Sequence, residues 1–427
     1  MNITHRERFS ILNLKVERIR FDSGLTLLLQ PGGRSSVCSV QSWLPTGSSH
    51  DPAGQSGLAH FFEHLMFTGT QKHPEGTLDE WVEENGGQLN AATWLDWTYY
   101  HAEMPTEAVF GYLDREADRF KNLSLEKNRL ERERLVVLNE RREQVESEPE
   151  AFLSEKLWAA ALAHHLYGRP TIGTTEEIKA ISVNDCASFY ERIYRPQNLT
   201  IAVSGRFEHQ PLIDHIRRVF SQGEKTPIGT TAGTPAATYT AGFHGEYSLP
   251  MRGEKLYAGL PSPALQSEDF AALEIAHHTI MEGDAGRIQR QLINEEELVT
   301  YASGFLPSLR HPSLYEMGFE LRRGVKAESV LERVRTQLER LHDGGITQKE
   351  LERARNRIEL DVLEGLQTVE QKAHSIGFWE TVTGDCRTSE KRLNQYQTLD
   401  THRVNESIRK WWSPSKLSWT IGRCQND

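Results

Sequence analysis

Cysteine is scarce in this chain of 427 residues. Its four cysteines, Cys38, Cys186, Cys386 and Cys424, lie far apart, and no two of them form a Cys-x-x-Cys pair. A disulfide framework needs several cysteines in a short chain, and a cysteine-rich zinc site needs closely spaced ones. The sequence therefore argues against both kinds of site.

Positive charge is also in deficit. The chain carries 49 lysine and arginine residues against 60 aspartate and glutamate residues, with a formal net charge of −11 and a pI near 5.9. A nucleic-acid-binding protein needs a basic face that contacts phosphates, so this balance argues against a nucleic-acid partner. Moderate acidity says little about other partners, because it mainly aids solubility.

Long hydrophobic runs are missing as well. No uninterrupted apolar stretch reaches about 18 residues, the length that a membrane-spanning helix requires. The chain starts with Met-Asn-Ile-Thr-His-Arg-Glu-Arg and has no apolar segment of signal-peptide length there. We therefore expect no membrane partner and a soluble protein, cytoplasmic, or periplasmic or organellar if a targeting segment has been removed.

The length and the composition predict a globular protein of more than one domain. Domains usually hold about 100 to 250 residues, and hydrophobic residues make up 37% of the chain. Near residues 221–242 the sequence becomes rich in Gly, Thr, Pro and Ala, which is typical of a linker. We place an N-terminal peptidase domain at 1–222, the linker at 223–242 and a C-terminal domain without metal at 243–427.

Hydrophobic periodicity predicts both strands and helices in each half. Residues 88–104 are rich in Thr, Trp and Tyr, which favours a β-hairpin with its turn near Leu95 and Asp96. The second half repeats the plan of the first in outline, which indicates a faint internal duplication. The other strands are expected at 25–29, 37–44, 199–203, 255–260 and 417–421. Helices are expected at 57–67, 78–85, 107–121, 125–145, 270–281, 327–341 and 348–364.

The segment from Leu58 to Phe67 contains the pattern His-x-x-Glu-His, formed by His60, Glu63 and His64. Successive residues of a helix turn by about 100°, so the two histidines fall roughly 40° apart and one turn along. Both imidazoles can then reach one ion, and Glu63 lies on the adjoining edge. Neutral imidazole is a good zinc donor, and catalytic zinc sites usually add a carboxylate and leave one position for water.

Zinc at such a site lowers the pKa of its bound water towards about 7, and a neighbouring carboxylate can take the proton. The pattern thus favours one Zn²⁺ per chain with Glu63 as the catalytic base. The alternative is a chance pattern whose histidines make ordinary surface or core hydrogen bonds. The flanking Phe61, Phe62, Met66 and Phe67 either shield the site from solvent or belong to the core.

The residues alone leave the third ligand open. The helix expected at 125–145 carries Glu133 and Glu140, about two turns apart on one face. Either carboxylate could meet the metal. Most acids on so charged a helix are solvated or paired with arginines. Spacing does not separate these two glutamates from the further candidates Asp96, Glu103, Glu131 and Glu143.

At this point the sequence resembles the pitrilysin-like zinc metallopeptidases, the inverted-motif family that includes insulin-degrading enzyme and mitochondrial processing peptidase. In that family a glutamate ligand follows the second histidine at a similar distance, in a segment like Glu-Arg-x-Val-Val-x-x-Glu. Residues 133–140 read Glu-Arg-Leu-Val-Val-Leu-Asn-Glu, and Glu140 stands 76 positions beyond His64. The resemblance implies that His60, His64 and Glu140 hold the metal and that Glu133 orients ligands or helps proton transfer.

The same resemblance implies the fold class, which is α+β with two tandem homologous domains. Each domain is a mainly antiparallel sheet covered by helices, and such domains enclose a chamber on dimerisation. In relatives the substrate adds as an extended strand to an exposed edge strand, which here contains Asn90 and Ala91. Main-chain pairing at this strand explains tolerance of many substrate sequences, and an ordinary hairpin is the alternative.

One segment departs from the family pattern. Complete relatives carry an arginine and a tyrosine that bind the substrate carbonyl, seven residues apart, but here Asn294 stands seven residues before Tyr301. A shift of one residue gives Ile293 with Thr300, so the arginine is missing in either register. Tyr301 stays a candidate for substrate binding. This departure implies the zinc-bearing subunit of a bacterial-type heterodimer whose homologous partner supplies the Arg and Tyr pair; a homodimer is the other arrangement.

The sequence therefore predicts a zinc-dependent endopeptidase that hydrolyses peptides or small unfolded polypeptides bound in extended form. Two alternatives keep the fold without the chemistry. One is a structural subunit, like the core subunits of the cytochrome bc1 complex, and the other is a subunit that holds peptides without cutting them. Structural relatives usually have degraded metal motifs, whereas the three ligands and the base are intact in this chain.

Overall fold

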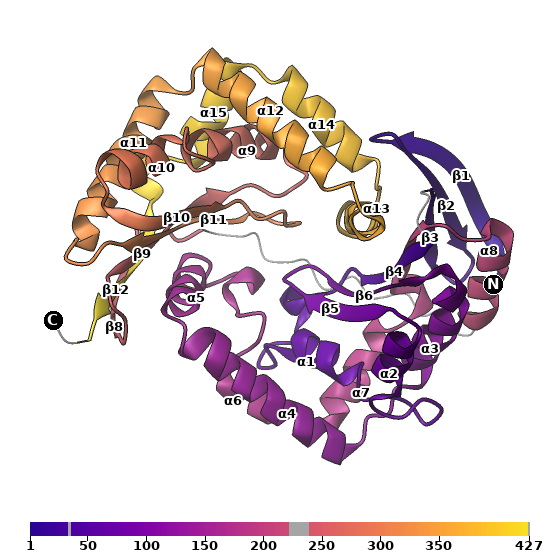
Figure 1. Ribbon diagram of the computed structural model, residues 1–427. Coiled ribbons are helices and arrows are strands. Elements are labelled where there is room, and N and C mark those ends of the chain that lie inside the picture. Colours follow the sequence, from indigo (N-terminus) through magenta and orange to yellow (C-terminus); the bar gives the residue numbers. More distant parts are fainter. Residues whose placement is uncertain (33–35, 222–238, 426–427) are drawn as a thin grey trace. The chain divides into compact units, whose positions relative to one another are not determined.

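The computed structural model describes all residues except 33–35, 222–238 and 426–427 (Figure 1). Contacts divide the chain into two compact units, neither of which is one continuous segment. The linker predicted at 223–242 lies outside the described residues as far as residue 238, and the two-domain division at that linker stays a prediction. Unit 1 comprises Met1–Leu138, Thr171–Gly233 and Leu363–Glu390, and unit 2 comprises Asn139–Pro170, Thr234–Val362 and Lys391–Asp427.

Unit 1 is built on a seven-stranded sheet with the strand order β1-β2-β3-β7-β4-β6-β5. β3 pairs in parallel with β7, and every other neighbouring pair is antiparallel. The central strand β7 is buried along its whole length, and β5 stands at one edge. The strands are β1 (Ile3–Ile11), β2 (Leu14–Phe21), β3 (Thr26–Pro31), β4 (Val37–Leu44), β5 (Gln88–Thr93), β6 (Thr98–Pro105) and β7 (Thr200–Gly205).

Helix α13 (Val369–Thr383) packs on one face of this sheet although it belongs to the second half of the sequence (Figure 1). Its Ala373 and Ile376 join Trp43 of β4 in one buried cluster. A Cβ atom at Gly377 would lie 2.3 Å from the Trp43 indole nitrogen, so only glycine permits this approach. The other helices of unit 1 are α1 (Leu58–Leu65), α2 (Thr77–Glu84), α3 (Val109–Asn122), α4 (Lys127–Arg141), α6 (Thr175–Ala180), α7 (Val183–Ile193) and α8 (His209–Val219).

Unit 2 holds a five-stranded sheet with the order β10-β11-β9-β12-β8, in which only β8 and β12 pair in parallel. Read from its other edge, the order is β8-β12-β9-β11-β10, which matches β3-β7-β4-β6-β5 of unit 1. The parallel pair β8 and β12 then corresponds to the parallel pair β3 and β7. The internal duplication is therefore plain in the topology, and the predicted α+β class is confirmed. The strands are β8 (His244–Leu249), β9 (Lys255–Ser262), β10 (Val299–Phe305), β11 (Ser313–Leu321) and β12 (Ser418–Cys424).

Helix α5 (Pro149–Ala161) makes the reciprocal exchange, because it comes from the first half of the sequence and packs on the unit 2 sheet. The Thr420 hydroxyl of β12 donates a hydrogen bond to the carbonyl oxygen of Leu153 on α5, at 3.0 Å.

No helix in the described part of the chain combines the length and the apolar character that a membrane crossing requires. The remaining helices are α9 (Glu268–Ile280), α10 (Arg287–Gln289), α11 (Ala327–Gly344), α12 (Gln348–Glu364), α14 (Thr388–Thr398) and α15 (Thr401–Trp411).

The hairpin predicted over residues 88–104 is formed by β5 and β6. Its turn is closed by a hydrogen bond from the Trp94 amide to the Trp97 carbonyl oxygen, at 2.9 Å. The helix predicted at 125–145 is α4 followed by a π-helical segment, Arg142–Glu146. Sequence analysis missed several elements that the structure shows. They are β1, β2, β8, β10, β11, α5, α6, α7, α8, α10, α13, α14 and α15.

Candidate metal centre

The start of α1, the helix of the His-x-x-Glu-His motif, is fixed by two neighbours. Gly57 precedes the helix with a φ of 89°, a left-handed conformation that favours glycine. A Cβ atom on Gly57 would lie 2.4 Å from the carbonyl oxygen of Ile172. The buried Asp51 carboxylate accepts hydrogen bonds from the backbone N–H groups of Gly57 and Ala59, at 2.8 and 2.9 Å. Asp51 thus satisfies free donors at the positive end of the helix.

The side chains of the motif lie on the partly exposed side of α1. The rings of His60 and His64 are neighbours, with centroids 4.9 Å apart and planes at 63°. Phe61, Phe62 and Met66 are at most 1% exposed, so they belong to the core. The hydrophobic side of α1 therefore packs the helix into unit 1 and leaves both imidazoles accessible.

Helix α4 carries the third candidate ligand. It is one continuous helix, and all but its last three residues belong to unit 1. One ligand atom from each of His60, His64 and Glu140 lies within 4.8 Å of the others. The glutamate on the last turn of α4 is thus the acid that meets the two histidines of α1.

These three side chains provide the donor set of a catalytic zinc site, two imidazoles and a carboxylate. Donor atoms around one zinc ion lie roughly 3.5 Å apart, because each is about 2.1 Å from the ion. The observed separations of up to 4.8 Å need only small side-chain rotations to reach that spacing. All three side chains are partly exposed, which leaves room for water and substrate. The residues therefore fit a zinc ion.

None of the four other acids considered from the sequence joins this group within the described residues. Asp96 is buried in the turn between β5 and β6, and Glu131 pairs with Arg134 at 3.1 Å. Glu103 lies on β6, and Glu143 is exposed in the π-helical segment after α4. Proximity therefore favours the glutamate on the last turn of α4.

Glu133 and Glu63 both lie next to the candidate ligands. A carboxylate oxygen of Glu133 is 3.7 Å from the Nδ1 atom of His64, within reach of electrostatic attraction. Burial raises the pKa of Tyr99 on β6 to about 12, and the negative charges of Glu370 and Glu63 add to the shift. The Glu63 charge therefore lies within electrostatic reach of Tyr99.

Arg134 holds α4 against the rest of unit 1. Its guanidinium group donates hydrogen bonds to the carbonyl oxygens of Ile178 and Ile181, the second at 2.6 Å. Its guanidinium carbon lies 5.6 Å from the ring centre of Phe61 on α1, a cation–π contact. The side chain is 9% exposed. Arg134 thus joins the helix of Glu140 to the helix of the two histidines.

Replacing Arg134 by methionine should lower stability and weaken metal binding together. Two buried carbonyl groups lose their donor, at a cost of about 1–3 kcal/mol each, so the free energy of unfolding should fall by roughly 2–6 kcal/mol. Arg132→Met is the control, because this arginine of the same helix has a side chain that is 54% exposed. Denaturant unfolding and zinc titration measure both effects. Equal stability of the two variants would contradict this role of Arg134.

The residues expected to bind substrate lie on edge strands. Asn90 and Ala91 belong to β5, which pairs only with β6 among the described strands. The Asn90 side chain accepts a hydrogen bond from the backbone N–H of Ala91 at 2.8 Å. Helix α1 contacts β5, so this edge adjoins the metal group. Tyr301 lies on β10, the corresponding edge strand of unit 2, and its side chain is exposed.

A second group of potential ligands, Glu380, Asp385 and Cys386, lies in unit 1. The Arg18 guanidinium donates hydrogen bonds to Glu380 at 2.9 Å and to Asp385 at 3.4 Å. Arg20 pairs with Glu380 at 3.2 Å, and Arg387 pairs with Asp385 at 2.9 Å. Arginine side chains therefore already neutralise these carboxylates, and we assign no metal to them.

Two positioning residues escaped the sequence analysis. A signal for Arg134 was present, because Leu130, Arg134, Val137 and Arg141 recur at helical spacing and all four are buried. Arginines within the apolar side of a helix indicate bound partners, since arginine is rarely buried alone. No comparable signal marks Asp51, whose hydrogen bonds go to backbone groups.

Comparisons with known proteins show which family the chain resembles along most of its length. Residues 28–175 match the family model described as insulinase, peptidase family M16, and residues 180–358 match the model described as the peptidase M16 inactive domain. The crystal structure of a protease from Helicobacter pylori shares the fold with a TM-score of 0.88 at 22% identity, covering 96% of this chain and 99% of that chain.

Two curated relatives extend the likeness to sequence. Zinc protease PqqE of Helicobacter pylori is 26% identical over 83% of this chain and 81% of its own. The human mitochondrial-processing peptidase subunit beta is 31% identical over 54% of this chain and 47% of its own, so that alignment spans about half of each protein. The two family models together span most of the chain, including both helices of the metal group. The chain belongs to the insulinase family of peptidases, family M16.

Proposed function

We propose that this chain is a zinc-dependent endopeptidase that hydrolyses peptides or small unfolded polypeptides bound in extended form. The observation that carries the proposal is the convergence of His60, His64 and Glu140 from two helices. Three protein ligands leave a coordination position open. A bound zinc ion supplies Lewis acidity that acts on a water molecule and on the scissile carbonyl group.

Glu63 is the general base in this proposal. It lies on the same helix as both histidines, directly before His64, so the base and two ligands share one rigid element. Its carboxylate takes a proton from the attacking water and passes it to the leaving amine. This transfer returns Glu63 to its charged form for the next cycle.

Glu133 positions His64. Its carboxylate lies 3.7 Å from His64 Nδ1 and favours one orientation of the ring. A carboxylate behind a metal-binding histidine also raises the basicity of the imidazole. Glu133 therefore supports the site without holding the metal, and assistance to proton transfer is the second role that we propose for it.

Strand β5 presents the substrate-binding edge. A peptide that adds to this edge as an extended strand bonds through its main chain, so side-chain identity matters little. The small side chain of Ala91 permits close approach, and Asn90 fixes the local backbone through its bond to the Ala91 amide. Peptides without folded structure are the class of substrate that this edge accepts.

A homologous partner subunit completes the site. Asn294, at the position of the expected arginine, is exposed in the π-helical segment Arg290–Glu295 before β10. An amide lacks the charged fork of a guanidinium group and stabilises an oxyanion less well. The similar mitochondrial-processing peptidase chain is by name a subunit. We therefore favour a heterodimer whose partner supplies Arg and Tyr, with Tyr301 as this chain's own contact to substrate.

Metal removal and partner addition test the proposal together. The metal-free chain should not cleave a quenched fluorogenic peptide, and one equivalent of zinc should restore cleavage. A homologous chain that carries Arg and Tyr should raise the rate roughly a hundredfold, the usual worth of an oxyanion donor. Absence of cleavage in every arm would contradict the peptidase, whereas full activity of the chain alone would contradict the heterodimer.

The second candidate function is a subunit that holds peptides without cutting them. The missing arginine at Asn294 is the observation that favours it. This candidate predicts stoichiometric zinc and peptide binding, but no cleavage with or without a partner. The same fluorogenic assay therefore separates the two functions.

A further inference from the structure

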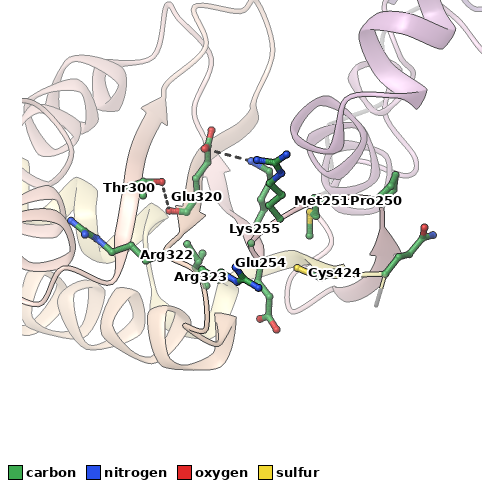
Figure 2. Close-up of a pocket in the computed structure, with 13 residues that line it drawn as sticks. Pro250, Met251, Glu254, Lys255, Thr300, Glu320, Arg322, Arg323 and Cys424 are labelled. Atoms are coloured by element: carbon green, nitrogen blue, oxygen red, sulfur yellow. Dashed lines mark hydrogen bonds and ion pairs between the residues drawn. The ribbon is translucent and has the colours of Figure 1, made fainter. Parts of the chain in front are cut away.

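A cavity of about 980 Å³ lies at one end of the unit 2 sheet (Figure 2). It opens where β9 and β10 begin and where β8, β11 and β12 end. Arg252 comes from the loop between β8 and β9, Thr300 from β10, and Arg322 and Arg323 from the turn after β11. None of these residues belongs to the metal group.

The lining of this cavity carries unmatched positive charge. Its two carboxylates are already paired: Glu320 lies 3.5 Å from Lys255, and Glu254 lies 3.1 Å from Lys326. Arg252 and Arg323 are exposed and make no ion pair or hydrogen bond with any residue that the structure describes. Two guanidinium groups are therefore available to an anionic ligand.

The cavity adjoins the free edge of β10, which pairs only with β11 among the described strands. The Gln289 side chain donates a hydrogen bond to the carbonyl oxygen of Ala302 at 3.1 Å, so this acceptor faces away from β11. Tyr301 and Phe305 of β10 are 55% and 47% exposed. An edge strand with an outward acceptor and exposed aromatic side chains is a template for another extended chain, which would take the place of Gln289.

Strand direction decides which end of a bound chain reaches the cavity. β10 begins at Val299, which pairs with Leu321, the residue directly before Arg322 and Arg323. Strand β10 therefore starts at the cavity and runs away from it. A peptide that pairs antiparallel with β10 runs towards the cavity and ends there with its carboxyl group. Antiparallel pairing is slightly the more stable of the two arrangements.

We propose that this cavity binds the free carboxyl end of an extended peptide that pairs with β10. A guanidinium group binds a carboxylate through two parallel N–H···O bonds, and Arg252 and Arg323 are free to form them. The class of ligand rests on the proposed function, because it assumes that the chain handles peptides. The cavity itself does not depend on zinc chemistry.

Peptide binding tests this site directly. The probe is an eight-residue peptide of Val and Thr with fluorescein on its amino end, prepared as free acid and as carboxamide. Binding is followed by fluorescence anisotropy on the full chain with Glu63→Gln, so that the probe stays intact. The acid should bind about tenfold more tightly than the amide, and Arg252→Ala and Arg323→Ala should each reduce this difference. Arg340→Ala, an exposed arginine on α11, is the matched control and should preserve it.

Pairing with β10 has its own control on the peptide side. Alternate backbone N–H groups of an extended peptide point towards β10, and the others point away from it. Two peptides are therefore N-methylated at alternate residues, one at the odd and one at the even positions. One of the two should lose binding while the other keeps it. Three results would overturn the proposal. The acid and the amide bind equally well, the Arg340 variant loses the preference for the acid as much as the Arg252 and Arg323 variants do, or neither peptide binds at about 1 mM. Zinc-dependent cleavage by the unchanged chain is scored separately, so failure of the peptidase and failure of this site give different results.

Discussion

Glu63→Gln should abolish peptide cleavage while zinc stays bound. Glutamine keeps the size of the side chain, but its amide cannot take a proton from water at neutral pH. General-base catalysis is worth about 10²–10⁴-fold, so the rate of fluorogenic cleavage should fall by roughly a thousandfold. The proposed ligands His60, His64 and Glu140 are unchanged, and elemental analysis should still find one zinc ion per chain.

The control for this variant is Glu84→Gln, the same chemical change at an exposed position of α2. Its rate and zinc content should match those of the unchanged chain. Both variants are assayed with and without the homologous partner, so a low rate of the isolated chain does not hide the effect. Retained turnover in the Glu63 variant would refute the base, and loss of zinc would show that Glu63 is itself a ligand.

The sequence could bring the two candidate histidine ligands and the proposed base together, because their geometry is local. The turn of one helix brings His60 and His64 to the same side, whatever the rest of the chain does. The sequence does not determine the third ligand. Glu133 and Glu140 share a face of α4, and spacing does not show which of them lies nearer to the histidines. Their ranking depends on how α4 packs on α1, a contact that runs through Arg134. From the sequence, only the resemblance to the family pointed to Glu140, and the structure shows this side chain near both histidines.

Strand β1 shows why part of the fold was missed. Its sequence is mostly polar, so it lacks the apolar alternation that predicts a strand. Its register is instead held by charges: Arg6 and Arg8 donate to the buried Glu17 of β2 at 2.6 and 2.9 Å. Ion pairs across strands leave no period-2 hydrophobic signal, although they stabilise the pairing once it forms.

The exchanged helices show a second limit. α13 and α5 each pack on the sheet of the other half of the sequence, and each has buried apolar residues such as Ile376 and Leu157. An apolar helix face indicates that a helix is packed but not which sheet it covers. The common topology of the two sheets was similarly invisible, because strand order depends on contacts between distant residues. The predicted duplication rested on element order alone.

Helix α4 is held by one arginine that precedes Glu140 in the sequence and by one that follows it. Arg134 bonds the carbonyl groups of Ile178 and Ile181, and Arg141 bonds both carboxylate oxygens of Glu155 on α5, at 2.9 and 3.0 Å. A ligand held by a rigid helix pays little conformational entropy when it binds a metal. This placement predicts that the Glu140 carboxylate is worth more to zinc affinity than any acid near it.

Glu140→Gln should therefore remove zinc from the chain. An amide oxygen carries no charge and is a weak zinc donor beside two imidazoles, so affinity should fall by more than the 10–100-fold that loss of an outer partner costs. Glu133→Gln makes the same change two turns earlier and should stay within about that 10–100-fold range. Glu143→Gln, exposed beyond the helix, should change nothing.

Competition with a chromophoric chelator measures the three zinc affinities, and circular dichroism checks that each variant keeps its helices. The order of effects decides between two arrangements of α4. If Glu140 binds zinc and Glu133 only orients His64, the loss of affinity rises from Glu143 through Glu133 to Glu140. If the Glu133 variant loses zinc while the Glu140 variant keeps it, then Glu133 is the ligand on α4. Arg134 would then not place Glu140 at the metal.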